Sequence, residues 1–384
     1  MKYLTRPREF SCVLCFVYFV SGIGLVSSQW LVDDEGCRTP DRGSGVCMPV
    51  KKCAPMVTLL QTIKRPISSA VLQRIQSYTC GVNEDGVKVC CPSGPINIGD
   101  NLQEPPDVSN HRNINLLPSD CGYLDTTDKI INGEDALLNE FPWMALLSYQ
   151  TRTGPTFRCG GSIINKNYIL TAAHCITNLK DKLFGIRVGE HSIRNSTDCE
   201  LQPNNSIKCA PPVQDLDIEE VIPHPSYNAA SFTNDIGLLR VSSMNFGVEN
   251  VRPICLPLGS QRNPNFKNVV VTGWGITGNG TSSDILQKVE LPIADKTKCA
   301  AVYSNYNIKL NVRQVCAGGV KNKDSCPGDS GGPMQIAAWV DGESKYIQQG
   351  IVSFGPRYCG LPGYPGVYTL IPYYMDWLLD TMRP

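Results

Sequence analysis

The cysteines of this chain constrain its fold more than any other feature. The sequence of 384 residues contains 18 of them, and two, Cys12 and Cys15, lie in an apolar stretch near the start. That stretch runs from Cys12 to Val26, follows basic residues and ends in small ones, which is typical of a secretory signal peptide over residues 1–28. Its removal leaves an even number of cysteines in an oxidising compartment. The sequence therefore predicts a secreted, extracellular protein with disulfides throughout.

The alternative for the apolar stretch is a membrane anchor. The stretch is shorter than a bilayer-spanning helix usually is, and Ser21, Gly22 and Gly24 dilute it. No later segment is apolar enough to span a membrane. The 35 basic and 35 acidic side chains balance, so no bulk charge attracts the chain to nucleic acid or to a membrane surface. We therefore expect partners to be recognised at local sites.

Six cysteines lie close together in residues 36–92, among many Gly, Pro and polar residues. So short a segment buries little apolar surface, and we expect a small domain that three disulfides hold together. Spacing alone leaves about 15 pairings open for six cysteines. A zinc site is the alternative, although the cluster contains no histidine. Within the domain, residues 57–78 have a helical period that Pro66 should divide in two.

The rest of the chain divides into a linker and a large domain. Residues 93–129 are rich in proline and polar residues and read as a linker. Residues 130–384 contain short apolar segments between turns, which predicts an all-β domain. The expected strands are 143–149, 168–172, 237–241, 269–274, 349–354 and 366–370. Residues 373–382 have helical spacing.

The segment GDSGGP, residues 328–333, is expected to carry the chemistry of this large domain. A serine hydroxyl attacks a carbonyl only when a base takes its proton and donors meet the developing oxyanion. The glycines around Ser330 permit a tight turn that presents the amides of Gly328 and Ser330 to a substrate as an oxyanion hole. Ser330 is therefore predicted to be the nucleophile, and Asp329 needs a separate explanation.

Two further motifs precede this segment: TAAHC at residues 171–175 and NDIGLL at residues 234–239. Each alone could be a turn or a buried polar residue, but the three in this order resemble the chymotrypsin family of serine proteases. The resemblance implies two antiparallel six-stranded β-barrels with the active site between them, followed by a C-terminal helix. It makes His174 the general base and Asp235 the residue that fixes its tautomer.

The resemblance also implies where specificity arises. Asp324 would form the floor of the primary pocket, and Gly355 and Gly366 would leave its walls open, so that a long cationic side chain binds through a charge-assisted bond. Cleavage after Arg or Lys is expected. Ser353, with Phe354 and Gly355, should form the edge that pairs with the substrate backbone. Phe354 departs from the commoner Trp, so the preference beyond the primary pocket is left open.

An activation site is implied at Lys129 and Ile130. In the family, cleavage before such an Ile frees an amine that inserts into the protease domain and pairs with the aspartate before the nucleophile, which would explain Asp329. An unpaired buried carboxylate is costly, so the oxyanion loop should be misplaced until this ion pair forms. The activator should itself prefer a basic residue, and self-cleavage is a hypothesis. The alternative is a surface turn at Asn132-Gly133, a common turn pair.

The cysteine cluster resembles the clip domain found before arthropod serine proteases. Such a domain could bind a cofactor or another protease, or be a spacer or a brace for the zymogen. Cys199 and Cys209 have no family partner, and their closeness suggests a local bridge. The pairing of Cys121 with Cys255 would keep a cleaved prosegment attached. The other implied pairs are Cys37 with Cys90, Cys47 with Cys80, Cys53 with Cys91, Cys159 with Cys175, Cys299 with Cys316, and Cys326 with Cys359.

Residues 190–198 form an acidic, oxygen-rich loop that could hold a calcium ion. Carboxylates of Glu190 and Asp198, with carbonyls of Ser192 and Asn195, would supply four ligands, and water the others. The alternative is a solvated acidic loop. Catalysis itself is expected to need no cofactor. Acceptor sequences for N-linked glycans begin at Asn195, Asn204 and Asn279.

Three functional hypotheses follow. The first is a trypsin-like zymogen acting in an extracellular, haemolymph-like cascade of arthropod immunity or development. Its substrate would be a further clip protease zymogen, a Spätzle-like precursor or prophenoloxidase, with an upstream trypsin-like activator and a serpin inhibitor as partners. The second is a catalytically silent adaptor, which the presence of all three triad residues disfavours. The third is a digestive protease, which would need neither a clip domain nor a tethered prosegment.

Overall fold

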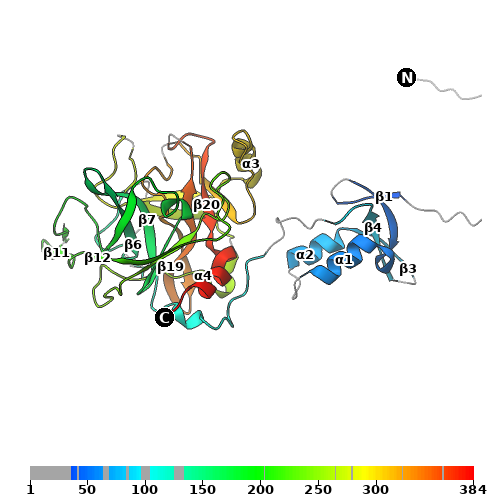
Figure 1. Cartoon of the computed structure of the whole chain (residues 1–384), viewed down its shortest axis with the longest axis horizontal. Helices are drawn as coiled ribbons and strands as arrows, with labels where there is room; N and C mark the ends of the chain where they lie inside the picture. Colours follow the sequence, from blue (N-terminus) through cyan, green and yellow to red (C-terminus); the bar gives the residue numbers. More distant parts are fainter. Residues whose placement is uncertain are drawn as a thin grey trace, which may run out of the picture. The chain divides into compact units, whose positions relative to one another are not determined.

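The computed structural model describes residues 36–40, 43–63, 69–83, 86–96, 104–124, 134–202, 204–263, 265–277, 280–321, 323–356 and 359–384. The expected signal peptide and the expected cleavage site at Lys129 lie outside these residues. Contacts divide the chain into two compact units, Met1–Ile63 with Ser77–Ile96 and Lys64–Gln76 with Asn97–Pro384 (Figure 1). Among the helices of the described ranges, none is long and apolar enough to cross a membrane.

The smaller unit is an antiparallel sheet with disulfides at its centre. Its strands follow the order β1-β2-β4-β3. They are β1 (Gly36–Arg38), β2 (Ser44–Pro49), β3 (Thr79–Asn83) and β4 (Gly86–Pro92). Its buried residues include Cys53, Met56, Tyr78 and Val89. Such a small core contributes little stability by itself, so the disulfides contribute much of the stability of this unit. In the sequence, α1 (Ala54–Thr62) ends before Pro66 and α2 (Ser69–Gln76) begins after it, as the helical period predicted.

The first half of the larger unit is a closed barrel of antiparallel strands. Its strand segments follow the order β12-β9-β6-β7-β8-β14-β13. They are β6 (Met144–Thr151), β7 (Gly154–Asn165), β8 (Tyr168–Thr171), β9 (Lys182–Val188), β12 (Gln214–Leu216), β13 (Ile218–Pro223) and β14 (Gly237–Val241). The two ends of this order, β12 and β13, are separated only by Asp217, so one interrupted strand closes a six-stranded barrel.

The second half is a similar barrel, with strand order β17-β20-β19-β18-β15-β16-β5. Its strands are β5 (Glu134–Asp135), β15 (Asn268–Gly273), β16 (Gln287–Pro292), β17 (Gln314–Gly318), β18 (Pro333–Val340), β19 (Glu343–Phe354) and β20 (Pro365–Leu370). A bridge between Ile293 and Ala317 joins its two edges, with the short β5 added outside. The expected all-β fold with two six-stranded barrels is thus confirmed.

The two barrels share a buried polar contact as well as an apolar core. Ser162 on β7 donates to Gln348 on β19 at 2.6 Å, and the Trp143 indole donates to Gln335 on β18 at 2.8 Å. These side chains are buried, so each bond fixes the position of one barrel on the other. Outside the barrels lie a two-stranded hairpin and two helices. They are β10 (Cys199–Leu201), β11 (Ile207–Cys209), α3 (Lys296–Ser304) and α4 (Met375–Thr381).

Part of the expected linker packs on the larger unit. The side-chain amide of Asn113 donates to the carbonyl of Leu379 at 2.8 Å, and His111 Nε2 lies 3.1 Å from an oxygen of Asp380. Both partners belong to α4, the helix that the spacing of residues 373–382 predicted. Residues 104–124 are therefore better described as a strap on the larger unit than as a free linker.

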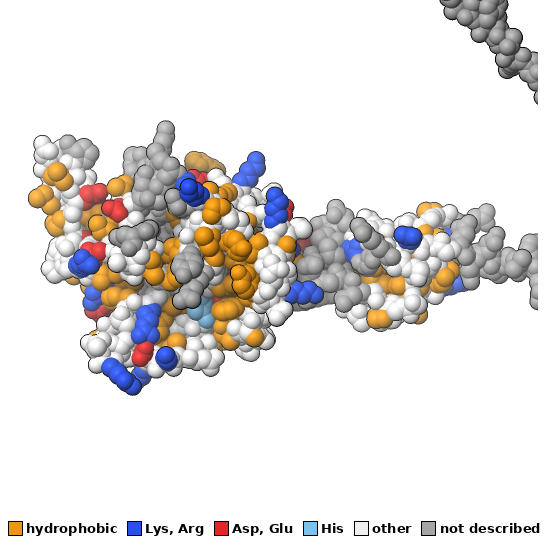
Figure 2. Space-filling model, turned by 90° about the horizontal axis from the view of Figure 1, so that it is seen from above, with side chains coloured by type: hydrophobic (Ala, Val, Ile, Leu, Met, Phe, Trp, Pro, Cys, Tyr) orange, Lys and Arg blue, Asp and Glu red, His pale blue; other side chains and the backbone are white. Residues whose placement is uncertain are grey.

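The described part of the smaller unit carries four basic side chains. These are Arg38, Lys51, Lys52 and Lys88. Figure 2 shows Lys and Arg on the smaller unit and side chains of both signs on the larger one.

Candidate active site

The histidine and the aspartate of the expected triad lie at the ends of neighbouring strands. His174 is in η4 (Ala173–Cys175), just after β8, and Asp235 comes just before β14. Because β8 pairs with β14, the two residues meet. Nδ1 of His174 lies 2.8 Å from Oδ2 of Asp235, and the His174 amide donates to Oδ1 at 2.9 Å. This contact orients the ring and leaves Nε2 as the nitrogen available to a serine.

Asp235 is fully buried and receives further hydrogen bonds from the second barrel. The hydroxyl of Ser353 donates to its Oδ2 at 2.5 Å, and Thr369 Oγ1 donates to its backbone carbonyl at 2.9 Å. Several donors are needed because a buried carboxylate loses its water. The sequence placed Ser353 at the edge of the specificity pocket, and its contact with Asp235 was missed. No local pattern reveals it, since the two residues are 118 positions apart.

Ser330 lies in a turn that leaves two amide groups free. Gly328 has φ of 106° and Gly331 has φ of 80°, backbone conformations that favour glycine. The amides of Asp329, Gly331 and Gly332 each donate to a carbonyl. Those of Gly328 and Ser330 donate to no acceptor within the described ranges. Two neighbouring free N–H groups are what an oxyanion hole requires.

This turn packs against the first barrel, close to the histidine. The amide of Gly160 donates to the carbonyl of Ser330 at 2.8 Å, and a Cβ atom at Gly331 would come within 3.2 Å of Cys175 Sγ. Cys175 follows His174 directly. Across the described residues, no hydrogen bond joins the Ser330 hydroxyl to His174. Such bonds often become short only when a substrate is bound.

Asp324 lines a cavity, and Gly366 lies beside its carboxylate. Its carboxylate accepts from the amides of Ser325 at 3.0 Å and Gly360 at 3.2 Å. A Cβ atom at Gly366 would lie 3.3 Å from Asp324 Oδ1, and one at Gly355 would lie 3.7 Å from Gly366 Cα, so larger residues would narrow the pocket. Burial raises the pKa of Asp324 to about 6, against the two amide donors that lower it. A cationic ligand would favour the ionised form.

Asp329 lines the same cavity as Asp324. Its two oxygens accept from the amides of Gly275 and Cys326, each at 2.8 Å. Burial raises its pKa to about 6, since these donors offset only part of the lost hydration. This cavity has a volume of about 640 Å³, and Lys288 is also part of its lining. Among the described side chains, none forms an ion pair with Asp329.

An aromatic cluster beside the histidine was missed by the sequence reasoning. The rings of Phe232 and His174 have centroids 6.3 Å apart, and Phe354 lies 4.7 Å from Phe232. Tyr303 of α3 adds an edge contact to Phe354 at 5.3 Å. Phe232 has φ of 52°, which is unusual for a bulky residue. Phe354 thus stacks on Phe232, where the sequence had only shown that it departs from Trp. The only sequence signal that could have placed Phe232 near the site is its position three residues before Asp235.

The acidic loop has buried carboxylates, one of them only partly satisfied. Glu190, Ser192 and Asp198 are all less than a tenth exposed, whereas Asn195 is exposed. Asp198 Oδ2 accepts from the amide of Ser192 at 3.1 Å, but its buried Oδ1 has no partner. Burial, together with the nearby Asp198 charge, raises the pKa of Glu190 to about 7, against the His191 amide and Arg187, which both lower it. A cation would satisfy both carboxylates.

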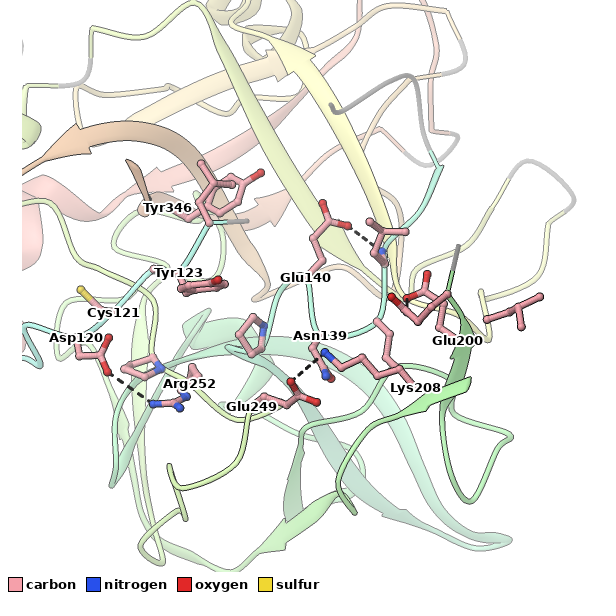
Figure 3. Close-up of a pocket in the computed structure, with 18 residues that line it drawn as sticks. Asp120, Cys121, Tyr123, Asn139, Glu140, Glu200, Lys208, Glu249, Arg252 and Tyr346 are labelled. Atoms are coloured by element: carbon pink, nitrogen blue, oxygen red, sulfur yellow. Dashed lines mark hydrogen bonds and ion pairs between the residues drawn. The ribbon is translucent and has the colours of Figure 1, made fainter. Parts of the chain in front are cut away.

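Eight disulfides join sixteen cysteines, in the pairs that the resemblance and the local bridge implied. His174 lies near Cys159 and Cys175, but their sulfurs are bonded to each other and are not free ligands. Cys121–Cys255 ties the strap to the rest of the larger unit beside a cavity of about 720 Å³ (Figure 3). Figure 3 shows Tyr123 and Arg252 on the wall of this cavity, whose lining includes none of the three triad residues.

The predicted glycan acceptors are placed consistently with modification. Asn195 and Asn204 are exposed. Asn204 Oδ1 accepts from the hydroxyl of Ser206 at 2.6 Å, within its own acceptor sequence. Asn279 lies outside the described residues.

The chain is similar to known proteins over both of its compact units. A family profile described as "Trypsin" matches residues 130–378, and one described as "Regulatory CLIP domain of proteinases" matches residues 37–91. The chain belongs to the trypsin family. Within that family it is a clip-domain serine protease, and the expected resemblance is confirmed.

Its trypsin-family relatives match over nearly their whole length. "Serine protease grass" of Drosophila melanogaster is 36% identical, with 96% of this chain and 97% of that protein covered. "Phenoloxidase-activating factor 1" of Holotrichia diomphalia is also 36% identical, with 96% and 97% covered. A crystal structure of the Drosophila Grass clip serine protease of the Toll pathway aligns with a TM-score of 0.64 at 36% identity, covering 91% of this chain and 97% of that one.

Proposed function

We propose that this clip-domain member of the trypsin family is the secreted zymogen of a serine endopeptidase that cleaves after Arg or Lys. The proposal rests mainly on the His174–Asp235 pair, which lies beside a turn with two free amides at Gly328 and Ser330. The names of its relatives refer to phenoloxidase activation, melanization and Spaetzle processing. They favour an extracellular cascade of arthropod innate immunity, with a role in development as the second possibility.

The geometry supports the following reaction. Nε2 of His174 takes the proton of the Ser330 hydroxyl as the oxygen attacks the substrate carbonyl. The amides of Gly328 and Ser330 donate to the resulting oxyanion, while Asp235 stabilises the charged imidazole. His174 then gives the proton to the leaving amine, and an acyl group stays on Ser330. Water, activated by the same histidine, releases that group and restores the serine.

The zymogen proposal is based on the surroundings of Asp329. This carboxylate is held by two amides and borders a cavity of about 640 Å³. An ammonium group entering the cavity would neutralise a charge whose burial is costly. Cleavage after Lys129 would create that group at Ile130. Because Asp329 is adjacent to Ser330, the ion pair would fix the oxyanion turn.

Activity is therefore expected to appear only on cleavage after Lys129. We expect the rate on an Arg amide peptide to rise at least a thousandfold, since donors in the oxyanion hole contribute roughly a hundred- to a thousandfold each. The measurement is amidase activity before and after limited proteolysis, with the new terminus identified by sequencing.

An uncleavable Lys129→Gln variant is the control for this experiment. Equal activity of the uncleaved and the cleaved protein would contradict the zymogen proposal. Complete cleavage without activity on Arg, Lys or Phe peptides would favour the catalytically silent adaptor. Self-cleavage is tested by incubating a Ser330→Ala zymogen with active enzyme. If the peptide bond after Lys129 stays intact, self-cleavage is excluded.

The partners proposed for the enzyme are proteins. As substrate we propose a further clip protease zymogen, a Spätzle-like precursor or prophenoloxidase, and as regulators an upstream trypsin-like activator and a serpin. The clip unit would bring its own surface to such contacts. The disulfide Cys121–Cys255 would keep it attached after cleavage.

We also propose that Glu190 and Asp198 hold a calcium ion. The unsatisfied buried Oδ1 of Asp198 and the raised pKa of Glu190 fit a hard cation with oxygen ligands. Carbonyls of Ser192 and Asn195 would complete the protein ligands. The ion would stabilise this loop and take no part in peptide hydrolysis.

Calcium is expected to raise the melting temperature by about 5 °C or more at a hundredfold excess over the dissociation constant. Because the pKa of Glu190 is raised to about 7, binding releases a proton and weakens as the pH falls below 7. Without calcium, the same raised pKa makes the folded state less stable as the pH rises from about 4.5 to 7. Differential scanning calorimetry with and without EDTA measures both effects.

The matched variants for the calcium experiment are Asp198→Asn and Asp217→Asn, because Asp217 is an exposed aspartate outside the loop. Asp198→Asn should remove the calcium response and Asp217→Asn should keep it. A response that survives in both variants would place the ion elsewhere.

A further inference from the structure

Four exposed basic side chains come together at one end of the first barrel. Arg152 lies in the turn of the β6–β7 hairpin, where Thr151 pairs with Gly154. Lys182 begins β9 opposite Gln150 on β6, so this hairpin end and the start of β9 are adjacent. Lys180 is two residues before Lys182. Arg158, on β7, completes the set, which we call the basic rim: Arg152, Arg158, Lys180 and Lys182.

The basic rim begins beside the reacting groups. Arg158 precedes Cys159, which is bonded to Cys175 next to His174. The guanidinium of Arg158 lies 5.9 Å from the ring centre of Tyr149, and the Tyr149 hydroxyl donates to the Cys175 carbonyl at 2.7 Å. On the other side of Cys159, the amide of Gly160 donates to Ser330. A chain bound at Ser330 therefore reaches the rim within a few residues.

The charge of the rim is largely unbalanced. Asp181 pairs with Arg158 at 2.6 Å. The other three cations have no ion-pair partner among the described residues. The nearby Arg187 differs, because Asp215 binds it at 2.7 Å and Glu190 at 3.3 Å. The rim thus keeps about three net positive charges in solvent, where they attract acidic groups.

The position of the pocket decides which part of a substrate meets the rim. Asp324 and Gly366 belong to the second barrel, so the basic side chain before the cleaved bond binds there. Ser330 lies between this pocket and the first barrel. The chain after the cleaved bond must therefore continue over the Cys159–Cys175 disulfide towards the rim. Exposed Phe184 and Leu179 add apolar surface, with 59% and 37% of their area accessible.

We propose that the basic rim binds acidic residues that follow the cleaved bond in a protein substrate. The inference rests on the proposed protease function and adds the substrate class: a protein with Arg or Lys before the bond and two or more acidic residues within about four positions after it. Each exposed ion pair contributes a few-fold in binding, so three together should give about tenfold.

The test uses enzyme cleaved after Lys129 and quenched fluorescent peptides that are identical up to the first residue after the bond. The next three residues are acidic in one peptide and the corresponding amides in the other. We expect kcat/KM to be about tenfold higher for the acidic peptide, and this ratio to approach one at about 1 M salt, where screening is short-ranged.

Two charge reversals provide the comparison. The double variant Arg152→Glu, Lys182→Glu should lower the ratio to one or below. Lys267→Glu makes the same change at an exposed residue before β15 and should keep the ratio. Hydrolysis of a short Arg amide, which has no residues after the bond, shows that each variant is folded and active.

The outcomes are distinct. The rim proposal is overturned if the unmodified enzyme cleaves the short amide but has equal kcat/KM for the acidic and the neutral peptide. It is also overturned if the double variant leaves the ratio of these two kcat/KM values unchanged. A cleaved enzyme that hydrolyses neither the short amide nor the peptides overturns the protease function together with the rim.

Discussion

Replacement of Ser330 by alanine is expected to lower kcat for Arg amide peptides by roughly a million-fold in the cleaved enzyme. Without the hydroxyl no acyl group can form, and the free amides of Gly328 and Ser330 then support only slow attack by water. The residual rate should resemble that of an enzyme from which all three triad residues have been removed. Steady-state hydrolysis measured over several hours at high enzyme concentration gives the value.

The fold of this variant can be checked independently of activity. Ser330→Ala leaves Asp324 unchanged, so the variant should still bind benzamidine, an amidinium probe of the pocket. Ser344→Ala, in the distant part of the β18–β19 hairpin, is the matched control and should retain full activity. Ser330→Ala could still hydrolyse the peptides substantially, even with an inhibitor specific for contaminating proteases. That result would show that another residue is the nucleophile.

The second large effect is expected from Asp324→Ser, which should lower kcat/KM for Arg and Lys peptides by roughly ten-thousand-fold. The carboxylate is held by the amides of Ser325 and Gly360 and would pair with the guanidinium of the substrate. Loss of a partner leaves the substrate charge buried without compensation. The glycine walls at Gly355 and Gly366 remain, so peptides with Phe or Leu should lose far less.

The pH dependence tests the same assignment. With the pocket empty, burial raises the pKa of Asp324 to about 6. Since only the carboxylate attracts a cation, benzamidine affinity should be full above this pKa and fall as the pH decreases through 6. Isothermal titration calorimetry at several pH values measures it. Asp341→Asn, in the β18–β19 turn, is the control; an unchanged Arg preference in Asp324→Ser would place the specificity residue elsewhere.

The local chemistry of the site could be read from the sequence because it depends on adjacent residues. The turn at Ser330 needs its glycines, and Gly328 and Gly331 adopt positive φ angles that other residues avoid. The break between α1 and α2 follows from one proline. Segments of six strands, β6, β8, β14, β15, β19 and β20, could be predicted for the same reason, since short apolar runs and turn residues are local signals.

The arrangement around these residues could not be read in this way. Ser353 binds Asp235 across 118 positions, and Phe232 meets Phe354 from another barrel. Cysteine spacing left several pairings open, and only the resemblance chose among them. The strap at His111 and Asn113 was expected to be a linker, because its composition carries no signal of the helix on which it packs.

The sequence by itself thus determined the family, the secreted disulfide-rich character expected of the chain, and the residue types that the reaction requires. The tertiary structure decided which charges are compensated. Strand register places Lys182 beside Gln150 at the end of a hairpin, and barrel packing leaves Asp329 facing a cavity. The physical reason is that electrostatic energies depend on distance and burial in three dimensions, and neither is encoded in the spacing of charges along the chain.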